Sequence, residues 1–161
     1  QVHNLLDWRT HLEPMRAWKA EGRLRYTGFT LYRPHAFDAL MDSVRAEPVD
    51  FLQFCYSIDE RDAEDDILPF CAANGIATLI NVPFGGGGLL SRLNGTPLPA
   101  LAGDLGCTSW AQFCLKYVIS HPAVTCAIPG TANPAHMADI LAAAEGEMPD
   151  EATRRDMAEL F

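Results

Sequence analysis

The chain has 161 residues and a formal net charge of −9 at pH 7, with 48% hydrophobic and 20% charged residues. This composition is typical of one globular domain with an apolar core, and the negative charge argues against nucleic acid and anionic membranes as partners. No apolar run approaches the roughly 20 residues of a membrane span, and the first residues do not resemble a signal peptide.

The chain contains five cysteines, an odd number without CxxC spacing, and four of them lie in apolar segments. We expect them to be small buried thiols in a reducing compartment, the cytoplasm. We expect no metal site from this spacing.

Strand-like and helix-like segments alternate along the chain. The expected strands are a strand end at 2–5 and strands at 24–30, 50–56, 76–84 and 124–128. Between them we expect a helix capped by Thr10 and Glu13 and ended by Gly22, a helix from Pro34 to Pro48, a helix at 63–73, and a helix from a capping box at Ser109 and Gln112 to Pro122. The last strand is followed by a helix from Asn133 to Gly146 and a short helix after Pro149. Because residues 2–5 read as the end of a strand whose beginning is absent, we expect a processed, truncated or incomplete chain.

This alternation with short connections predicts parallel βαβ units. Two architectures fit it, namely part of a (β/α)8 barrel and a small doubly wound open sheet. In both, ligands bind at the carboxyl ends of the strands. Unusual residues fall at those ends, which makes that edge the expected site: His3, Thr30, Gln53, Asn81 and the pair Gly130-Thr131.

The last expected strand leads through a small-residue turn into a helix. Asn133 is placed as the N-cap and Pro134 as the first helical residue. Free backbone N–H groups and the positive end of the helix dipole favour an anion there, best of all phosphate. An ordinary strand-to-helix connection is the alternative.

The stretch IPGTANPAHMADI, residues 128–140, resembles the nucleotide-phosphate loop of the aldo/keto reductase family, which often reads IPGT-x-x-P-x-H/R-x-x-x-N. The resemblance covers nearly the whole chain but only the second part of the family's domain. It implies an α/β fold, an incomplete (β/α)8 TIM barrel of about four to five parallel strands, in which residues 1–161 form the C-terminal part of one barrel domain. The implied activity of the intact protein is NAD(P)H-dependent reduction of an aldehyde or ketone.

The resemblance also implies roles at the strand ends. His3 matches the catalytic histidine that orients and polarises the substrate carbonyl. Gln53 and Thr30 match residues that hold the nicotinamide carboxamide, while Asn81 stands where many members carry a stacking aromatic, which an amide cannot replace. From the residues alone, His3 and Gln53 could instead be satisfied by nearby backbone.

Two further segments match the part of the family that holds the cofactor's phosphates. The loop after the seventh strand passes over the pyrophosphate, where glycine allows close approach of the backbone, although a plain flexible loop is the alternative. The cofactor-binding residues implied in the two segments are Pro83, Phe84, Gly85 and Gly86, then Gly130, Thr131, Asn133 and His136. The implied cofactor is NADP, with NAD left possible, because members with strong NADP preference carry Lys in place of Gly130 and Arg in place of His136.

The family's proton-donating Tyr and its Lys and Asp partners lie on earlier strands, and no tyrosine here has that context. We therefore expect most of the cofactor cradle but no catalysis from the 161-residue chain alone. One alternative is a catalytically inactive half-barrel that binds nucleotide or a partner and forms a homodimer. Another is an unrelated α/β enzyme with His3 as base, for which a GxSxG elbow is absent.

Overall fold

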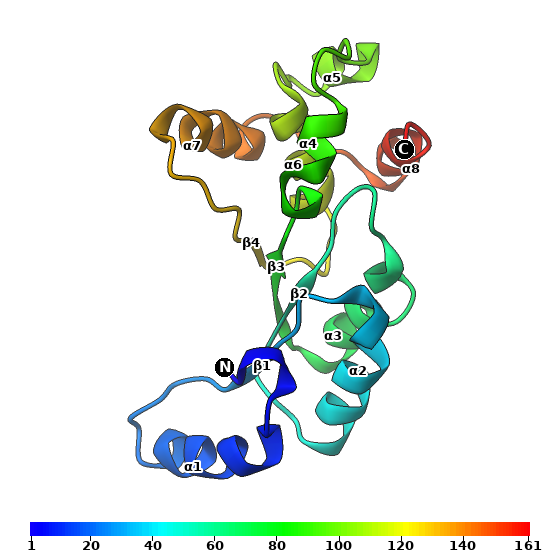
Figure 1. The fold of residues 1–161 in the computed structure, drawn as a ribbon. Coiled ribbons are helices and arrows are strands. Elements are labelled where there is room, and N and C mark those ends of the chain that lie inside the picture. Colours follow the sequence, from blue (N-terminus) through cyan, green and yellow to red (C-terminus); the bar gives the residue numbers. More distant parts are fainter.

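A computed structural model describes residues 1–161, and it contains one parallel sheet whose strand order follows the chain. The strands are β1 (Gly28–Thr30), β2 (Phe51–Cys55), β3 (Ala77–Asn81) and β4 (Cys126–Ala127). Val2 forms a parallel bridge to Phe29, so the strand end expected at 2–5 is confirmed at Val2 alone, and His3–Leu5 form a 3-10 turn instead. An order without reversal is that of a barrel segment, whereas a doubly wound sheet reverses at a switch point. The first of the two architectures is therefore confirmed (Figure 1).

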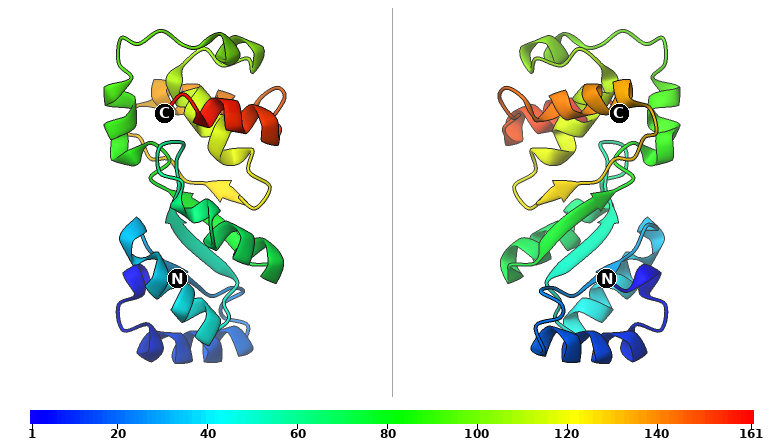
Figure 2. Two further views of the ribbon diagram at one scale, coloured as in Figure 1. Left: turned by 90° about the vertical axis from the view of Figure 1, so that its right-hand side faces the viewer. Right: turned by 90° about the vertical axis from the view of Figure 1, so that its left-hand side faces the viewer.

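Helices connect the strands and gather at two ends of an elongated molecule. They are α1 (Trp8–Ala20), α2 (Phe37–Ala46), α3 (Ile67–Asn74), α4 (Gly88–Arg92), α5 (Ala100–Asp104), α6 (Trp110–Ile119), α7 (Pro134–Leu141) and α8 (Glu151–Ala158), with 3-10 turns at His3–Leu5, Pro34–Ala36, Asp62–Glu64, Gly85–Gly87 and Ala142–Ala144. Figures 1 and 2 show α1 at one end, α4 to α8 at the other, and α2 and α3 alongside the strands between them. None of these helices combines the length and apolar character that crossing a membrane requires.

The caps expected for α6 and α7 are confirmed. The Ser109 hydroxyl accepts the Gln112 N–H at 3.1 Å, and the Gln112 side-chain oxygen accepts the Thr108 N–H at 2.8 Å. The Asn133 side chain accepts the Ala135 N–H at 3.0 Å. These short-range bonds satisfy donors that a helix start leaves open, so the sequence pattern suffices to locate them.

Several expected boundaries are wrong. Helix α1 begins at Trp8 with Asp7 before it, so Thr10 lies inside the first turn, where its N–H donates to the Asp7 carbonyl at 2.9 Å. The strands expected at 24–30 and 124–128 are shorter, because regular pairing exists only where a neighbouring strand runs alongside. The helix expected at 63–73 is split, and α5 replaces part of an expected loop.

The two faces of the sheet differ in burial. Phe29, Leu52, Phe54 and Ile80 point to one face and are fully buried, and α2 and α3 lie along one side of the sheet (Figure 1). The opposite face, which we call the inner face, carries residues that are half-buried or exposed: Phe51, Gln53, Ala77, Leu79 and Cys126. The register pairs Gln53 with Leu79 and Leu79 with Cys126, which places their side chains on the same face.

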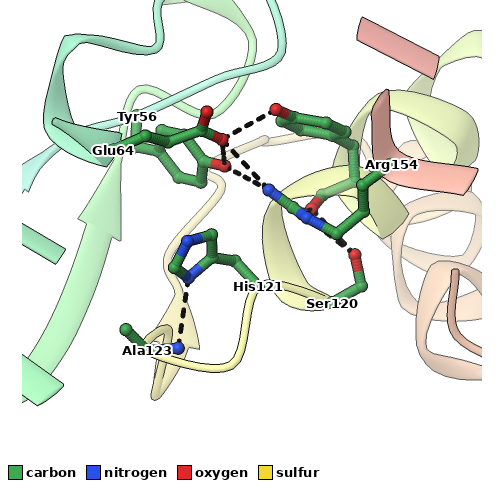
Figure 3. A network of polar contacts seen from close by, with 7 residues as sticks. Tyr56, Glu64, Ser120, His121, Ala123 and Arg154 are labelled. Atoms are coloured by element: carbon green, nitrogen blue, oxygen red, sulfur yellow. Dashed lines mark hydrogen bonds and ion pairs between the residues drawn. The ribbon is translucent and has the colours of Figure 1, made fainter. Parts of the chain in front are cut away.

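Helix α8 is attached to the rest of the fold by the buried guanidinium of Arg154 (Figure 3). Its Nη2 donates to the Tyr56 hydroxyl at 2.7 Å and to Glu64 Oε1 at 3.1 Å. The Tyr117 hydroxyl donates to the same Glu64 oxygen at 2.7 Å, and the guanidinium lies 4.1 Å from the centre of the Tyr117 ring. Burial raises the pKa of both Tyr56 and Tyr117, so both remain neutral donors. The network joins the end of β2, the turn at Asp62–Glu64, α6 and α8.

Replacing Arg154 by Met should lower the free energy of unfolding by about 2–4 kcal/mol, because it leaves the Glu64 carboxylate without its cation. Arg155→Met is the matched control, since Arg155 is exposed and pairs only with Glu151 one helical turn away; its effect should stay within about 0.5 kcal/mol. Urea unfolding followed by circular dichroism measures both. Equal effects of the two substitutions would refute the role given to the network.

Asp50 joins α1 to the sheet. Its carboxylate accepts the Lys19 ammonium at 2.6 Å and the Thr27 N–H at 2.7 Å. Partial burial by itself would raise the pKa of Asp50, but the hydrogen bonds from Lys19 and Thr27 outweigh it and hold the pKa below its ordinary value. The lowered pKa means that folding favours the ionised form of this carboxyl.

Asp50→Asn should therefore destabilise the fold at pH 7, and the difference from the parent chain should shrink as the pH falls below about 4. The direction of this pH dependence follows from the lowered pKa of Asp50. The contribution of the ionised carboxylate to the free energy of unfolding is present above the unfolded-state pKa and is lost as the pH falls through the folded-state pKa. Urea midpoints between pH 2.5 and 7 measure it, with Asp42→Asn on the exposed side of α2 as control. A difference that is independent of pH would count against the proposed linkage.

Candidate functional site

The carboxyl ends of the parallel strands meet at one edge of the sheet. Thr30 lies opposite Gln53 in the register, and Cys55 lies opposite Asn81. In barrels and open parallel sheets this is the edge at which ligands bind.

His3 is held beside the end of β1. The Thr30 N–H donates to the Val2 carbonyl at 2.9 Å, and the Asn4 N–H donates to the Thr30 hydroxyl at 3.2 Å. Between these two anchors His3 begins the first 3-10 turn and is exposed. Its imidazole can therefore donate a hydrogen bond to a ligand at the strand ends.

Asn81 carries the only buried side-chain polar atom of the chain that lacks a partner. Its Nδ2 donates to the Leu31 carbonyl at 3.4 Å, while its Oδ1 accepts nothing. A buried amide oxygen without a donor costs free energy, so this atom is ready to accept an N–H or O–H group. The half-buried Gln53 and Asn81 both lie on the inner side of the sheet.

A cleft of about 660 Å³ opens beside this edge, within the range of small-molecule sites. It is bounded by the loop after β3 with α4, by the start of α6, and by the segment from β4 into α7. Its lining residues are Val82, Pro83, Phe84, Gly86, Gly87, Leu90, Leu93, Asn94, Gly95, Thr96, Trp110, Ala111, Ile128, Pro129, Gly130, Thr131, His136, Asp139 and Ile140.

The glycine loop of the cleft has a backbone that other residues rarely adopt. Gly85, Gly86 and Gly87 have φ of +56°, +65° and +89°. A Cβ at Gly86 or Gly87 would meet no atom within 4 Å, so backbone conformation, and not lack of space, requires glycine. The Gly85 and Gly87 N–H groups close turns onto Val82 and Phe84. The backbone itself, without side chains, thus forms this wall.

The opposite wall begins with the turn between β4 and α7. The Thr131 hydroxyl accepts the Asn133 N–H at 3.1 Å, and the Asn133 cap takes the Ala135 N–H. Pro134 has no N–H to offer. The start of α7 therefore keeps fewer free donors than an uncapped helix, and anion binding must draw on the neighbouring turn as well.

Asp139 forms the polar part of the same wall, and it is fixed by α6. The Ser109 hydroxyl donates to Asp139 Oδ2 at 2.7 Å and Gln112 Nε2 donates to Oδ1 at 2.6 Å. On the facing side, Trp110 Nε1 donates to the Thr96 carbonyl at 2.8 Å. The residues that cap α6 thus also position a carboxylate in the cleft.

The structure separates the sequence-predicted site residues into two groups. Pro83, Phe84, Gly86, Gly130, Thr131 and His136 line the cleft. His3, Thr30, Gln53 and Asn81 lie at the strand ends beside it. Two others lie at its margin, since Gly85 faces the Asp59 carboxylate and Asn133 caps α7. Their ligand contacts stay predictions.

Sequence reasoning missed Asp139, Trp110 and the segment from Leu90 to Thr96. Asp139 follows His136 by three residues, so helical spacing alone could have placed both on one side of α7. Trp110 and the Leu90–Thr96 segment carry no such local signal, because their position depends on how α4 and α6 pack.

A sequence profile of the aldo/keto reductase family matches residues 8–156. Among solved structures, an aldo/keto reductase from Klebsiella pneumoniae in complex with NADP and acetate is 27% identical, with a TM-score of 0.71. Another from Klebsiella pneumoniae, in complex with NADPH, is 24% identical with a TM-score of 0.69, and AKR11C1 from Bacillus halodurans, in its holo form, is 20% identical with a TM-score of 0.68. Each match covers 92% of this chain and 52%, 52% and 54% of the other chain, respectively.

The chain thus spans about half the length of these structures. The two matches below 25% identity show likeness of fold alone. A search of curated protein sequences finds no match.

Proposed function

Since the chain belongs to the aldo/keto reductase family, we propose that residues 1–161 form the C-terminal part of a single barrel domain that reduces an aldehyde or ketone with a nicotinamide dinucleotide. The observation that carries the proposal is the glycine-walled cleft beside a strand edge that bears His3 and a buried, unpartnered oxygen of Asn81. The rest of the barrel, including the proton donor, must come from polypeptide outside these residues.

The residues present fit a dinucleotide. The cleft has room for an adenosine diphosphate group, and its glycine loop lets backbone approach phosphate oxygens. At the strand ends, Thr30 and Gln53 are adjacent in the register, and Asn81 Oδ1 needs a donor such as a carboxamide NH2. When bound, the dinucleotide supplies the hydride.

Two tasks fall to the chain's own residues. His3 donates a hydrogen bond to the carbonyl oxygen and stabilises the negative charge that develops on it. Thr30, Gln53 and Asn81 orient the nicotinamide ring by its carboxamide. None of the tyrosines is placed to give the proton: Tyr26 and Tyr32 are exposed on loops, while Tyr56 and Tyr117 are committed to the Arg154 network.

His3→Ala, made in the complete barrel protein, should lower kcat for carbonyl reduction about 100-fold or more, because a preorganised donor to the oxyanion is lost. The dissociation constant of the dinucleotide should be unchanged, because the role proposed for His3 is a hydrogen bond to the carbonyl substrate and not to the dinucleotide. His11→Ala on the exposed side of α1 is the matched control. Steady-state oxidation of NADH and NADPH with a panel of aldehydes measures it.

An unchanged kcat for His3→Ala would rule out this role. The 161-residue chain alone should bind dinucleotide but show no carbonyl reduction. Reduction by the isolated chain would show that the proton donor lies within these residues.

The inner face favours a further proposal about what covers it. Phe51 and Leu79 are only half-buried there, and Cys126 is exposed. Sheet edges and apolar faces left open in this way promote association. The remaining strands of the barrel would cover the face in the complete protein, and a second copy could cover it in a catalytically inactive homodimer.

Thiol labelling distinguishes a protein whose inner face is covered from one whose inner face is open to solvent. All five cysteines are free, and four are buried. Burial raises the pKa of Cys71 and Cys114 to about 12, so these thiols should not react in the native state. In a monomeric 161-residue chain, Ellman's reagent should react rapidly with one thiol, and Cys126→Ser should abolish that reaction.

In the complete barrel or in a homodimer, labelling of Cys126 should slow at least tenfold, with oligomeric state read from light scattering. Fast labelling in every form would exclude a cover on the inner face. Five unpaired thiols also support the proposed reducing location, the cytoplasm.

A further inference from the structure

We propose that the cleft selects NAD(H) over NADP(H), that is, a dinucleotide whose adenosine ribose carries no 2′-phosphate. This inference rests on the proposed function and concerns the charge of the cleft. It departs from the NADP and NADPH seen in the Klebsiella pneumoniae structures.

The lining of the cleft contains no lysine and no arginine. Its one acidic residue is Asp139, and its one residue able to become cationic is His136. A phosphate monoester carries between one and two negative charges near neutral pH and is bound in proteins mainly by arginine or lysine. Histidine offers such charge only in its protonated form.

The hydrogen-bond partners of Asp139 do not cancel its charge. Both of its hydrogen-bond partners, Ser109 and Gln112, are neutral donors. They fix the carboxylate in place without supplying a positive charge, so the wall presents a fixed negative charge to the cleft. A 2′-phosphate in the same cleft would be repelled by it, and the repulsion is strong where water is excluded.

The cations of the surrounding helices are engaged elsewhere. Arg92, at the end of α4, pairs with Asp59 on the far side of the glycine loop. Lys116 of α6 is buried and donates to the carbonyls of Glu145, at 2.6 Å, and Glu147, at 3.2 Å. Helix α5 contributes only the acidic Asp104, and α7 has no lysine or arginine. These helices therefore leave no lysine or arginine free to reach a 2′-phosphate.

The same features suit an unmodified ribose and a diphosphate. A fixed carboxylate is a good acceptor for ribose hydroxyl donors. The diphosphate of NAD(H) carries one charge on each phosphorus, and a loop of glycines without side chains lets such a group approach the backbone closely.

The test is the binding of NADH, NADPH, ADP-ribose and 2′-phospho-ADP-ribose to the 161-residue chain and to the complete protein, by calorimetry. We expect NADH and ADP-ribose to bind at least tenfold more tightly than their 2′-phosphorylated counterparts. Because the discrimination is electrostatic, the ratio should narrow as salt rises from 50 to 500 mM.

Two variants assign the effect to this wall. Asp139→Asn should improve the affinity for NADPH and so narrow the ratio of NADH to NADPH affinity at least threefold. His136→Arg should improve the affinity for NADPH about tenfold. Asp104→Asn, exposed on α5, is the control and should leave the ratio unchanged. His136 is itself exposed, so its variant tests the proposal even if Asp139→Asn does not fold.

Equal or tighter binding of NADPH by the parent chain would overturn the inference and leave the proposed function intact. Binding of neither dinucleotide, in the complete protein as well as in the chain, would overturn both. Tight NADH binding with a ratio that neither variant changes would refute the assignment to Asp139 and His136.

Discussion

Parallel pairing in chain order is the constraint on which the rest of this structure depends. Each strand must return to the same end of the sheet before the next one begins, so a helical connection is needed between every pair. These crossovers pass over one face, which buries Leu52 and Phe54 and leaves Phe51 and Leu79 half-covered on the other. The same constraint makes every strand end at one edge, where Thr30, Asn81 and the turn after β4 come together.

The features that could be predicted from the sequence are those decided within a few residues. Ser109 and Asn133 cap their helices because the groups that they satisfy lie two or three residues away. Asp150 does the same for α8, where it accepts the Thr153 N–H at 2.8 Å. The residues Thr10 and Glu13 have equally good capping-box spacing, but the helix start predicted from them is wrong, because α1 begins at Trp8.

What could not be predicted depends on packing between distant segments. The lengths of β1 and β4 depend on which neighbour lies beside them, and Asp139 gains its place from a helix that begins about thirty residues earlier in the chain. Two segments of the cleft, the glycine loop and the turn at Gly130-Thr131, were expected to hold the cofactor's phosphates because they resemble segments of the family, and both line the cleft. The sequence did not predict the part of the cleft in which Trp110 donates a hydrogen bond to the Thr96 carbonyl.

The Arg154 network has a consequence for how this polypeptide matures during synthesis. Tyr56 and Glu64 leave the ribosome long before Arg154, which lies 98 and 90 residues further along the chain. Until Arg154 has emerged, the Glu64 carboxylate and the two tyrosines have no guanidinium to surround. Contacts of such long sequence separation close late. The nascent protein therefore cannot complete this part of its interior until the segment that becomes α8 has been synthesised.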